Sequence, residues 1–372
     1  MNHDLGEQQQ QQQLEEEEAR HLEQQRRRLR PARDPFAMSS DDDDGDAGIL
    51  HLLETAARAA VVAFTLTFVA WLYCRLSQRR CKCAARLEGK TALVTGGSAG
   101  IGYETAKALA SRGARVIFTC RNMEVGRQAL ASMIEASGGG DVVLKHLDLC
   151  SLSSVRRLAA DVLETEPRLD LLVNNAGRSA PPQRSLTVDG YETTIQSNHL
   201  GHALLTGMLL DLLRRSAPSR VVVVSSMVHA WTQLDPDDPF LEHHYTPSRA
   251  YGLSKLYNVY FARELADKLR GEQVTVNALH PGLVKSRFFR EPPITYCSKF
   301  LRYAVIPLFS KSPSEGAQTS IHLCLAPELA HTTGRYFMDC REARPGAHAL
   351  DPVLQRQAWE ITEQALNVRL CN

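Results

Sequence analysis

The chain has 372 residues, which allows one large domain or two ordinary domains, and its formal net charge is +1. Such a balanced charge gives no indication of nucleic acid or another polyanionic partner. The nine cysteines are odd in number and irregularly spaced, which favours reduced thiols in a cytosol-facing domain over a disulfide framework.

Residues 1–48 predict a disordered, low-complexity tail. A glutamine run at Gln8–Gln13 is followed by blocks of like charge, including Glu15–Glu18 and Asp41–Asp44. These residues offer few apolar side chains, so folding cannot bury enough surface to offset its loss of chain entropy.

Residues 56–74 predict a single transmembrane helix. Ala59–Cys74 carries no charge, and Ala56–Arg58 brings the stretch close to the roughly 20 residues that a bilayer span requires. Trp71 and Tyr73 lie near one end, where aromatic side chains are typical of a membrane interface. The alternative is a buried core helix.

The flanks of this stretch predict its orientation. The linker at residues 75–86 is basic, whereas the preceding flank holds Asp41–Asp44 and Glu54. The positive-inside rule therefore places the domain that follows in the cytosol. The endoplasmic reticulum is the expected membrane, and other internal membranes remain the alternative. Cys74, Cys81 and Cys83 beside the span are candidate palmitoylation sites.

Residues 87–372 predict one doubly wound α/β domain, a Rossmann fold with a mainly parallel sheet. Short β-branched runs alternate with amphipathic stretches, and Val221–Val224 is apolar throughout, as in a strand buried on both faces. The predicted strands are Thr91–Thr95, Arg115–Cys120, Val142–Asp148, Leu169–Asn174, Arg220–Ser225 and Val274–His280. The predicted helices are Ile101–Arg112, Glu124–Ser137, Leu152–Glu164, Tyr191–Arg215, Tyr251–Arg270 and Pro352–Leu366.

A glycine-rich turn joins the first predicted strand to the first predicted helix at Thr95–Gly102. Glycines in this position let the backbone approach a pyrophosphate, whose negative charge suits a helix N-terminus. The pattern T-G-x-x-x-G-x-G therefore predicts a dinucleotide site rather than a merely structural turn. The candidate contacts are Gly96, Ser98, Gly100, Ile101 and Gly102.

The end of the second predicted strand favours NADP(H) over NAD(H). An acidic residue there would bind the ribose 2′-hydroxyl, but this chain has Cys120-Arg121-Asn122. Arg121 can pair with a 2′-phosphate; the alternative is an arginine that only covers the surface. Asp148 ends the third predicted strand and is expected either to contact the adenine or to cap the next helix.

Tyr251 and Lys255 stand four residues apart in a predicted helix, so they share one face. A phenol exchanges protons poorly at neutral pH, because its ordinary pKa is about 10. A nearby ammonium favours the phenolate, so the pair predicts a general acid/base with a lowered tyrosine pKa. The same spacing also arises by chance in many helices.

The order of these motifs resembles the short-chain dehydrogenases/reductases. The resemblance covers roughly Leu87–Phe337 and rests on these residues: Thr95–Gly102, Asn174–Gly177, Asn198, Ser226, Tyr251, Lys255, Pro281 and Gly282. It implies hydride transfer between an alcohol and a carbonyl, with NADPH as cofactor. It also leaves a homodimer open.

The resemblance implies a role for each matching residue. Asn198 would hold a water that relays protons, Ser226 would bind the substrate oxygen, and Tyr251 would be the general acid/base. Lys255 would bind the nicotinamide ribose as well as assist Tyr251. The remaining expected cofactor contacts are Asn175, Ala176, Gly177, Pro281, Gly282, Val284 and Ser286.

Four features resemble the branch that contains the retinol dehydrogenases. Trp231–Arg249 lengthens the segment between Ser226 and Tyr251, and three short sequences are similar to that branch: Thr119–Asn122, Ser197–His202 and Gly334–Phe337. The longer segment makes the choice between Ser225 and Ser226 less direct, and alignment with the family favours Ser226.

No metal site is predicted. His199 and His202 lack a third ligand, and Cys81-x-Cys83 has no second ligand pair near it in the sequence.

An apolar segment, Glu291–Phe309, is expected to cover the substrate; ordinary packing against the sheet is the alternative. Together these features predict a membrane-anchored NADP-dependent oxidoreductase acting on a lipophilic alcohol or its carbonyl compound, with retinol/retinaldehyde favoured. The rivals are a reductase of other lipid aldehydes or steroids, and a nucleotide-binding scaffold or redox sensor without turnover.

Overall fold

The computed structural model describes residues 20, 24–25, 42–285 and 309–371. The chain divides into two compact units, residues 1–69 and 70–372. Most of the predicted disordered tail lies outside the described residues. So does the predicted substrate cover, except for Phe309.

Helix α2 spans Asp42–Ser77, and its segment Leu50–Leu72 is long and apolar enough to cross a membrane. This candidate span begins earlier than the predicted 56–74, and the helix itself begins inside the predicted tail. Arg58 donates to the Glu54 carboxylate one turn away, at 2.6 Å. The two charges therefore pair one turn apart within the candidate span.

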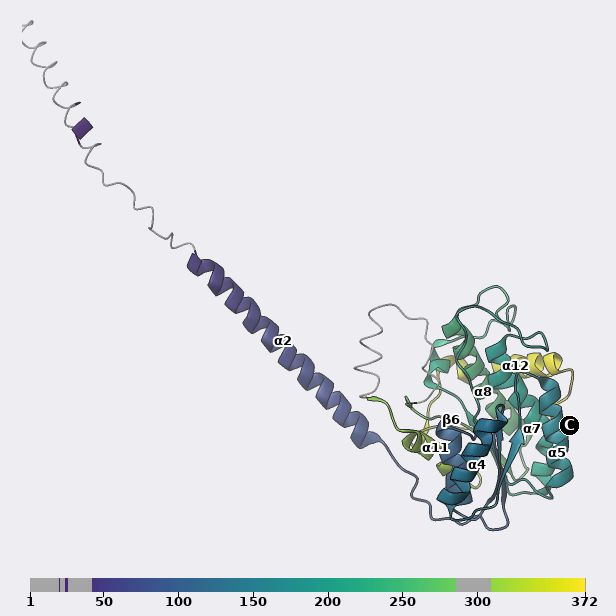
Figure 1. The fold of residues 1–372 in the computed structure, drawn as a ribbon. Helices are drawn as coiled ribbons and strands as arrows, with labels where there is room; N and C mark the ends of the chain where they lie inside the picture. The colour runs from purple at the N-terminus through teal and green to yellow at the C-terminus, as the bar shows by residue number, and fades with distance from the viewer. Residues whose placement is uncertain (1–19, 21–23, 26–41, 286–308, 372) are drawn as a thin grey trace, which may run out of the picture. The chain divides into compact units, whose positions relative to one another are not determined.

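An eight-stranded sheet has the order β3-β2-β1-β4-β5-β6-β7-β8 (Figure 1). Strands β1 to β7 pair in parallel, and β8 is antiparallel to β7. The fold class predicted from the sequence is confirmed. The strands are β1 Thr91–Val94, β2 Arg115–Cys120, β3 Val142–His146, β4 Leu171–Asn174, β5 Ser219–Val224, β6 Val274–His280, β7 Tyr336–Met338 and β8 Arg341–Ala343.

Helices cover both faces of the sheet, which explains why its central strands are apolar throughout. In β5, Val221 and Val223 pack into one core cluster, whereas Val222 and Val224 pack into the other. One face is covered by α3 Gly100–Ala110, α4 Met123–Ser137 and α11 Pro313–Leu325; the other by α5 Leu152–Thr165, α7 Gly201–Arg215, α8 Pro247–Lys268 and α12 Pro352–Leu366.

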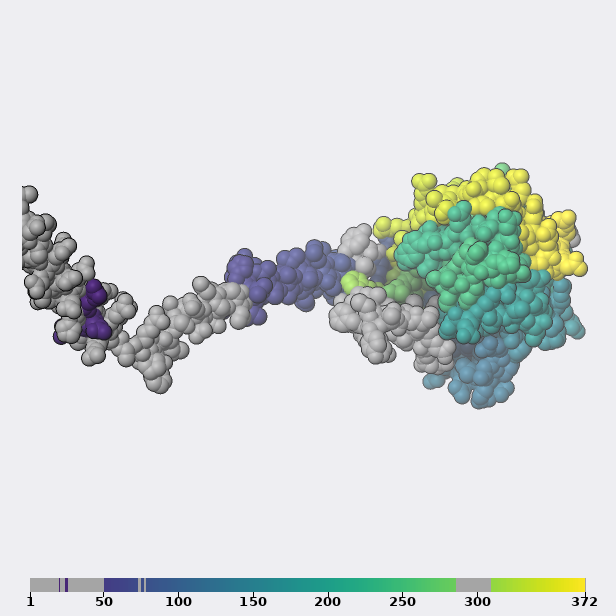
Figure 2. All heavy atoms as spheres, turned by 90° about the horizontal axis from the view of Figure 1, so that it is seen from above, coloured from purple at the N-terminus to yellow at the C-terminus, as the bar shows by residue number. Residues whose placement is uncertain are grey.

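The C-terminal helix matches its predicted bounds. It packs on α8, where Trp359 stacks on Phe261 with ring centroids 5.6 Å apart. Figure 2 shows this C-terminal segment in yellow beside the green segment that includes α8. The contact anchors the far side of the helix that carries Tyr251 and Lys255.

The predicted helix Tyr191–Arg215 is divided in the structure. A short helix α6, Thr193–Ile195, leads into a π-helical turn η1, Gln196–Leu200, and then into α7. Single π turns inside helices often occur at functional sites. This turn carries Asn198, and periodicity in the sequence does not distinguish it from ordinary helix.

Candidate active site

The parallel strands end at one edge of the sheet, and the order reverses between β1 and β4. Ligands of such sheets bind at the carboxyl edge beside this reversal. The glycine-rich turn follows β1, and Asn175 follows β4, so both lie there. The topology therefore brings together segments that the sequence places far apart.

Glycines shape the turn after β1. Gly96 adopts a φ of +65°, which residues with side chains rarely take. A Cβ on Gly102 would lie 2.3 Å from the Gly96 carbonyl oxygen. The first turn of α3 can therefore fold back onto the loop only with glycine at position 102.

The N-terminus of α3 fits a pyrophosphate. Its N-cap residue, Ala99, supplies no side-chain hydrogen bond to the helix. The first backbone N–H groups of an α-helix lack helical partners, and together with the helix dipole they bind anions. In contrast, Asn122 caps α4 through its own side chain. The uncapped α3 terminus, with the glycine-rich turn folded against it, has the features that a dinucleotide requires.

A hydrogen-bonded chain, unforeseen from the sequence, fixes this loop. The Thr95 hydroxyl accepts from the backbone N–H groups of Asn175 and Ala176, at 2.9 and 3.0 Å, and lies 2.8 Å from His202 Nε2. His202 Nδ1 lies 3.1 Å from the Asn198 carbonyl, which can only accept, so Nδ1 carries the proton. The glycine-rich turn is thus coupled to the π turn.

His199 and His202 each have hydrogen-bond partners within the protein. Burial lowers the pKa of His202 to about 4 and that of His199 to about 3, so both rings are neutral. His199 instead lies 2.8 Å from the Thr362 hydroxyl and stacks on Tyr257. These contacts within the protein account for the positions of both histidine side chains.

Arg121 and Asp148 stand at the ends of neighbouring strands. Arg121 is exposed directly after β2. Asp148 accepts from the backbone N–H of Cys150 at 2.9 Å, whereas Ser151 is the residue that caps α5. Asp148 therefore orders the turn and does not serve as the helix cap that the sequence left open. Its carboxylate is half-buried near the carboxyl edge.

Asn198 braces the segment after β4. Its side-chain oxygen accepts from the Arg178 N–H at 2.9 Å, and its amide donates to the Arg178 carbonyl and the Ser254 hydroxyl, both at 3.0 Å. A Cβ on Gly177 would lie 3.3 Å from Lys255 Nζ and 3.5 Å from Asn198 Oδ1. Asn198, Gly177 and Lys255 therefore meet in one place.

The structure distinguishes the two adjacent serines. The buried Ser225 hydroxyl donates to the backbone carbonyl of Lys255 at 2.7 Å. Ser226 follows β5 as the N-cap of a 3₁₀ turn, η2 Met227–Trp231, and its hydroxyl hydrogen-bonds the Tyr251 side chain. Of the two serines, Ser226 is therefore the one that interacts with the phenol, and its catalytic role stays a prediction.

Burial governs the charges of the tyrosine–lysine pair. It raises the pKa of Tyr251 to about 12, opposed by the hydrogen bond with Ser226, and it lowers the pKa of Lys255 to about 8. The sequence-based expectation of a lowered tyrosine pKa is thus wrong for this structure. Lys255 Nζ donates to the Val224 carbonyl at 3.1 Å and lies 5.8 Å from the Tyr251 ring centroid.

His229 holds the backbone of Ser226, a contact that the sequence analysis missed. Its Nδ1 donates to the Ser226 carbonyl at 2.6 Å, and its Nε2 accepts from the Gly346 N–H at 2.9 Å. Both ring nitrogens are therefore used to link the serine to the C-terminal part of the domain. The signal was weak because Gly346 is distant in sequence.

The segment after β6 is described only in part. Gly282 has a φ of +89°, and a Cβ there would meet the Lys311 side chain at 2.9 Å. Val284 is buried and packs against Gly316 of α11, close to Ile101 of α3. Pro281 leads into this loop, while Ser286 lies outside the described residues.

Comparison with known proteins agrees with this arrangement. A family model described as short chain dehydrogenase matches residues 90–293. Retinol dehydrogenase 14 of Mus musculus is 43% identical over 292 residues, covering 76% of this chain and 87% of the relative. The chain belongs to the short-chain dehydrogenase family. Its relatives place it in the retinol dehydrogenase-like branch: retinol dehydrogenase 11 of Homo sapiens is 40% identical, covering 77% of this chain and 89% of the relative.

Solved structures of other proteins share the fold. An uncharacterized protein from Mycobacterium paratuberculosis has a TM-score of 0.63 and 30% identity, covering 77% of this chain and 96% of its own. The Pseudomonas aeruginosa RhlG/NADP active-site complex has a TM-score of 0.55 and 33% identity, covering 71% and 98%. The family and this NADP complex support a nicotinamide cofactor for the present chain, and the uncapped α3 terminus fits one.

Proposed function

We propose that this short-chain dehydrogenase is a membrane-anchored, NADP-dependent oxidoreductase that interconverts a lipophilic alcohol and its carbonyl compound, with retinol and retinaldehyde as the favoured pair. The observation that carries this proposal is the hydrogen bond between Ser226 and Tyr251, with Lys255 beside them at the carboxyl edge of the sheet. The names of its relatives support the substrate class.

The residues divide the work of carbonyl reduction. A nicotinamide cofactor, when bound, would supply the hydride. Tyr251 keeps its proton at neutral pH because burial raises its pKa, so it acts as the general acid toward the substrate oxygen. The Ser226 hydroxyl donates to the same oxygen as negative charge develops there. Lys255, protonated below about pH 8, supplies positive charge beside them.

The proton path would start from the same residues. Asn198 is proposed to help relay protons to Lys255, which lies within reach of the space beside Gly177. The side chain of Asn198 hydrogen-bonds the backbone N–H and carbonyl of Arg178. Asn198 would therefore also keep the space beside Gly177 open. Asn175, Ala176, Gly177, Pro281, Gly282, Val284 and Ser286 remain the proposed contacts along the cofactor.

Turnover with a panel of carbonyl compounds tests the function. Full-length protein in detergent should oxidise NADPH with all-trans-retinaldehyde faster than with a straight-chain lipid aldehyde or a steroid ketone. A preference for either of the latter would replace the retinoid with another lipophilic substrate. Folded protein that binds NADPH but turns over no carbonyl compound would identify a nucleotide-binding scaffold instead.

Arg121→Ala is expected to erase most of a preference for NADPH over NADH. Arg121 is exposed directly after β2, and Asn122, the residue that follows it, is occupied as a helix cap. A charged contact with the 2′-phosphate is worth about 2 kcal/mol, or about thirtyfold in affinity. Titration of both cofactors into wild type and variant measures this difference.

The matched control for the cofactor test is Arg127→Ala. Arg127 is an exposed arginine of the following helix that pairs with Glu124 at 2.7 Å. Its removal should leave the ratio of affinities unchanged. Equal affinity of the wild-type protein for NADPH and NADH would contradict the proposed cofactor preference.

Protease treatment of sealed microsomes tests the proposed anchor and orientation. The apolar span Leu50–Leu72 is followed by basic residues, so the catalytic domain is expected in the cytosol. Added protease should digest residues 87–372 while a luminal marker survives, and carbonate should leave the protein in the membrane. Protection of the domain without detergent, or complete extraction by carbonate, would contradict this topology.

A further inference from the structure

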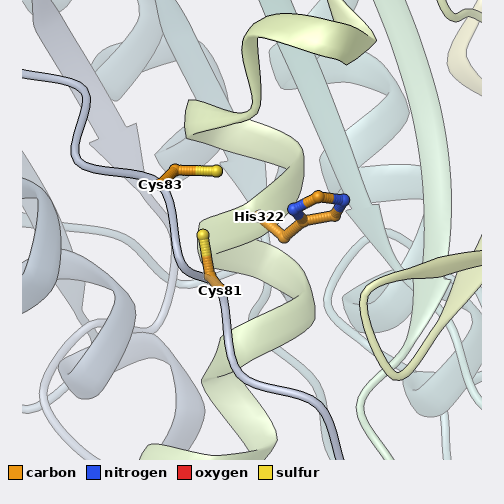
Figure 3. A group of neighbouring side chains, drawn as sticks. All are labelled: Cys81, Cys83 and His322. Carbon is orange, nitrogen blue, oxygen red and sulfur yellow. The ribbon is translucent and has the colours of Figure 1, made fainter.

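Three potential metal ligands meet away from the active site. Cys81, Cys83 and His322 each offer a ligand atom, and these atoms lie within 4.8 Å of one another (Figure 3). Within the described part of the chain they form the one such group of three or more. The two cysteines precede β1 on a segment without regular secondary structure, and His322 belongs to α11.

The local backbone explains why both thiols face the helix. Burial alternates along residues 81–86: Cys81, Cys83 and Ala85 are half-buried, and the residues between them are exposed. Such alternation is typical of an extended segment, in which residues two apart point to the same side. The Cys-x-Cys spacing therefore presents both sulfur atoms to α11.

Gln318 fixes the register between this segment and the helix. Its side-chain oxygen accepts from the Cys81 backbone N–H at 3.0 Å, and its amide donates to the Ser314 carbonyl at 2.9 Å. Gln318 and His322 are four residues apart in α11, so they lie on one face. The contact that holds Cys81 in place also brings it beside His322.

We propose that Cys81, Cys83 and His322 bind a zinc ion that fastens the segment before β1 to α11. Two thiolates and one imidazole are a donor set typical of Zn²⁺, with Zn–S near 2.3 Å and Zn–N near 2.0 Å. A tetrahedral ion separates its ligand atoms by about 3.8 Å or less.

Three protein ligands leave one position of a tetrahedral ion for a fourth ligand, a carboxylate or a water. Binding would exchange the two S–H bonds for two Zn–S bonds and release two protons, with no change of oxidation state.

Metal titration of the reduced full-length protein tests the site. After removal of metal with a chelator, wild type should bind one equivalent of Zn²⁺ in competition with a chromophoric chelator. Co²⁺ in its place should give a thiolate-to-cobalt charge-transfer band. Cys81→Ser, Cys83→Ser and His322→Gln should each weaken Zn²⁺ binding by at least about 100-fold, and Gln318→Ala by about tenfold, as for a residue that positions a ligand.

Matched controls use a cysteine and a histidine outside the group. Cys371→Ser and His331→Gln should retain the wild-type metal affinity and the cobalt band, and each variant's circular dichroism establishes that it is folded. Folded wild type without stoichiometric metal would overturn the proposal. So would a Cys81–Cys83 disulfide or a thioester-linked acyl group on either cysteine in protein isolated from membranes.

Discussion

Tyr251→Phe is expected to lower turnover by about 10²–10⁴-fold while folding and NADPH binding are retained. The variant keeps the ring, which packs against the core, and removes only the hydroxyl that hydrogen-bonds Ser226. Single-turnover reduction of retinaldehyde, with NADPH affinity measured separately, distinguishes a loss of chemistry from a loss of binding.

A neighbouring tyrosine provides the control for this prediction. Tyr257 lies on the same helix, and its buried hydroxyl donates to the Pro239 carbonyl at 3.2 Å. Tyr257→Phe should lower stability by about 1 kcal/mol and leave turnover per folded molecule unchanged. A folded Tyr251→Phe protein with near-normal turnover would remove Tyr251 as the general acid.

The adjacent serines sharpen the same test. Ser226→Ala should lower turnover by about 10²-fold or more, because it removes the donor to the reacting oxygen. Ser225→Ala should act on stability instead, since its hydroxyl donates to the Lys255 backbone carbonyl. The opposite pattern would assign the catalytic role to Ser225.

Lys255→Met is expected to abolish most turnover, weaken NADPH binding and yet raise stability at neutral pH. Burial lowers the pKa of Lys255 to about 8, against about 10.4 in an unfolded chain. Below pH 8 both states bind the proton, so holding the buried charge costs the native state on the order of 3 kcal/mol. Loss of the hydrogen bond to the Val224 carbonyl should reduce the stabilisation of the variant by about 1 kcal/mol. This loss is small because Asn258 still donates to the same oxygen.

The stability of the wild-type protein should also depend on pH in a defined direction. Between pH 8 and about 10.4 the unfolded state binds more protons than the native state, so wild-type stability should rise with pH in that window. Lys255→Met should lack this rise, and wild-type carbonyl reduction should slow as pH increases through about 8. Denaturant unfolding of cofactor-free protein at several pH values measures the first effect.

Lys268→Met is the matched control for this test, because Lys268 is more exposed on the same helix and pairs with Glu264 at 3.6 Å. Its variant should keep the wild-type pH dependence. A Lys255→Met protein that is less stable than wild type at pH 7 would contradict the burial argument.

The buried charge of Lys255 destabilises the native state, and this favours a chemical role for the residue over a structural one. A buried ammonium is retained where an apolar side chain would hold the fold more firmly, which is typical of residues kept for chemistry. The surrounding structure compensates locally: Gly177 leaves room for Nζ, and the Val224 carbonyl accepts from it.

The sequence by itself determined the fold class, the strands β1 to β6 and the position of the dinucleotide loop, whereas β7 and β8 were not predicted. These features depend on local patterns: apolar runs for strands covered on both faces, and glycines where a backbone must turn or approach a phosphate. That Tyr251 and Lys255 share one face of a helix likewise follows from their spacing of four residues and helix geometry alone.

Tertiary structure decided what depends on the direction of a side chain or on contacts between distant segments. It directed Ser225 to the backbone of α8 and Ser226 to Tyr251, placed His202 against Thr95, and brought His322 beside Cys-x-Cys. It also corrected the expected pKa of Tyr251, because burial is a property of the packed domain and not of the spacing between two residues.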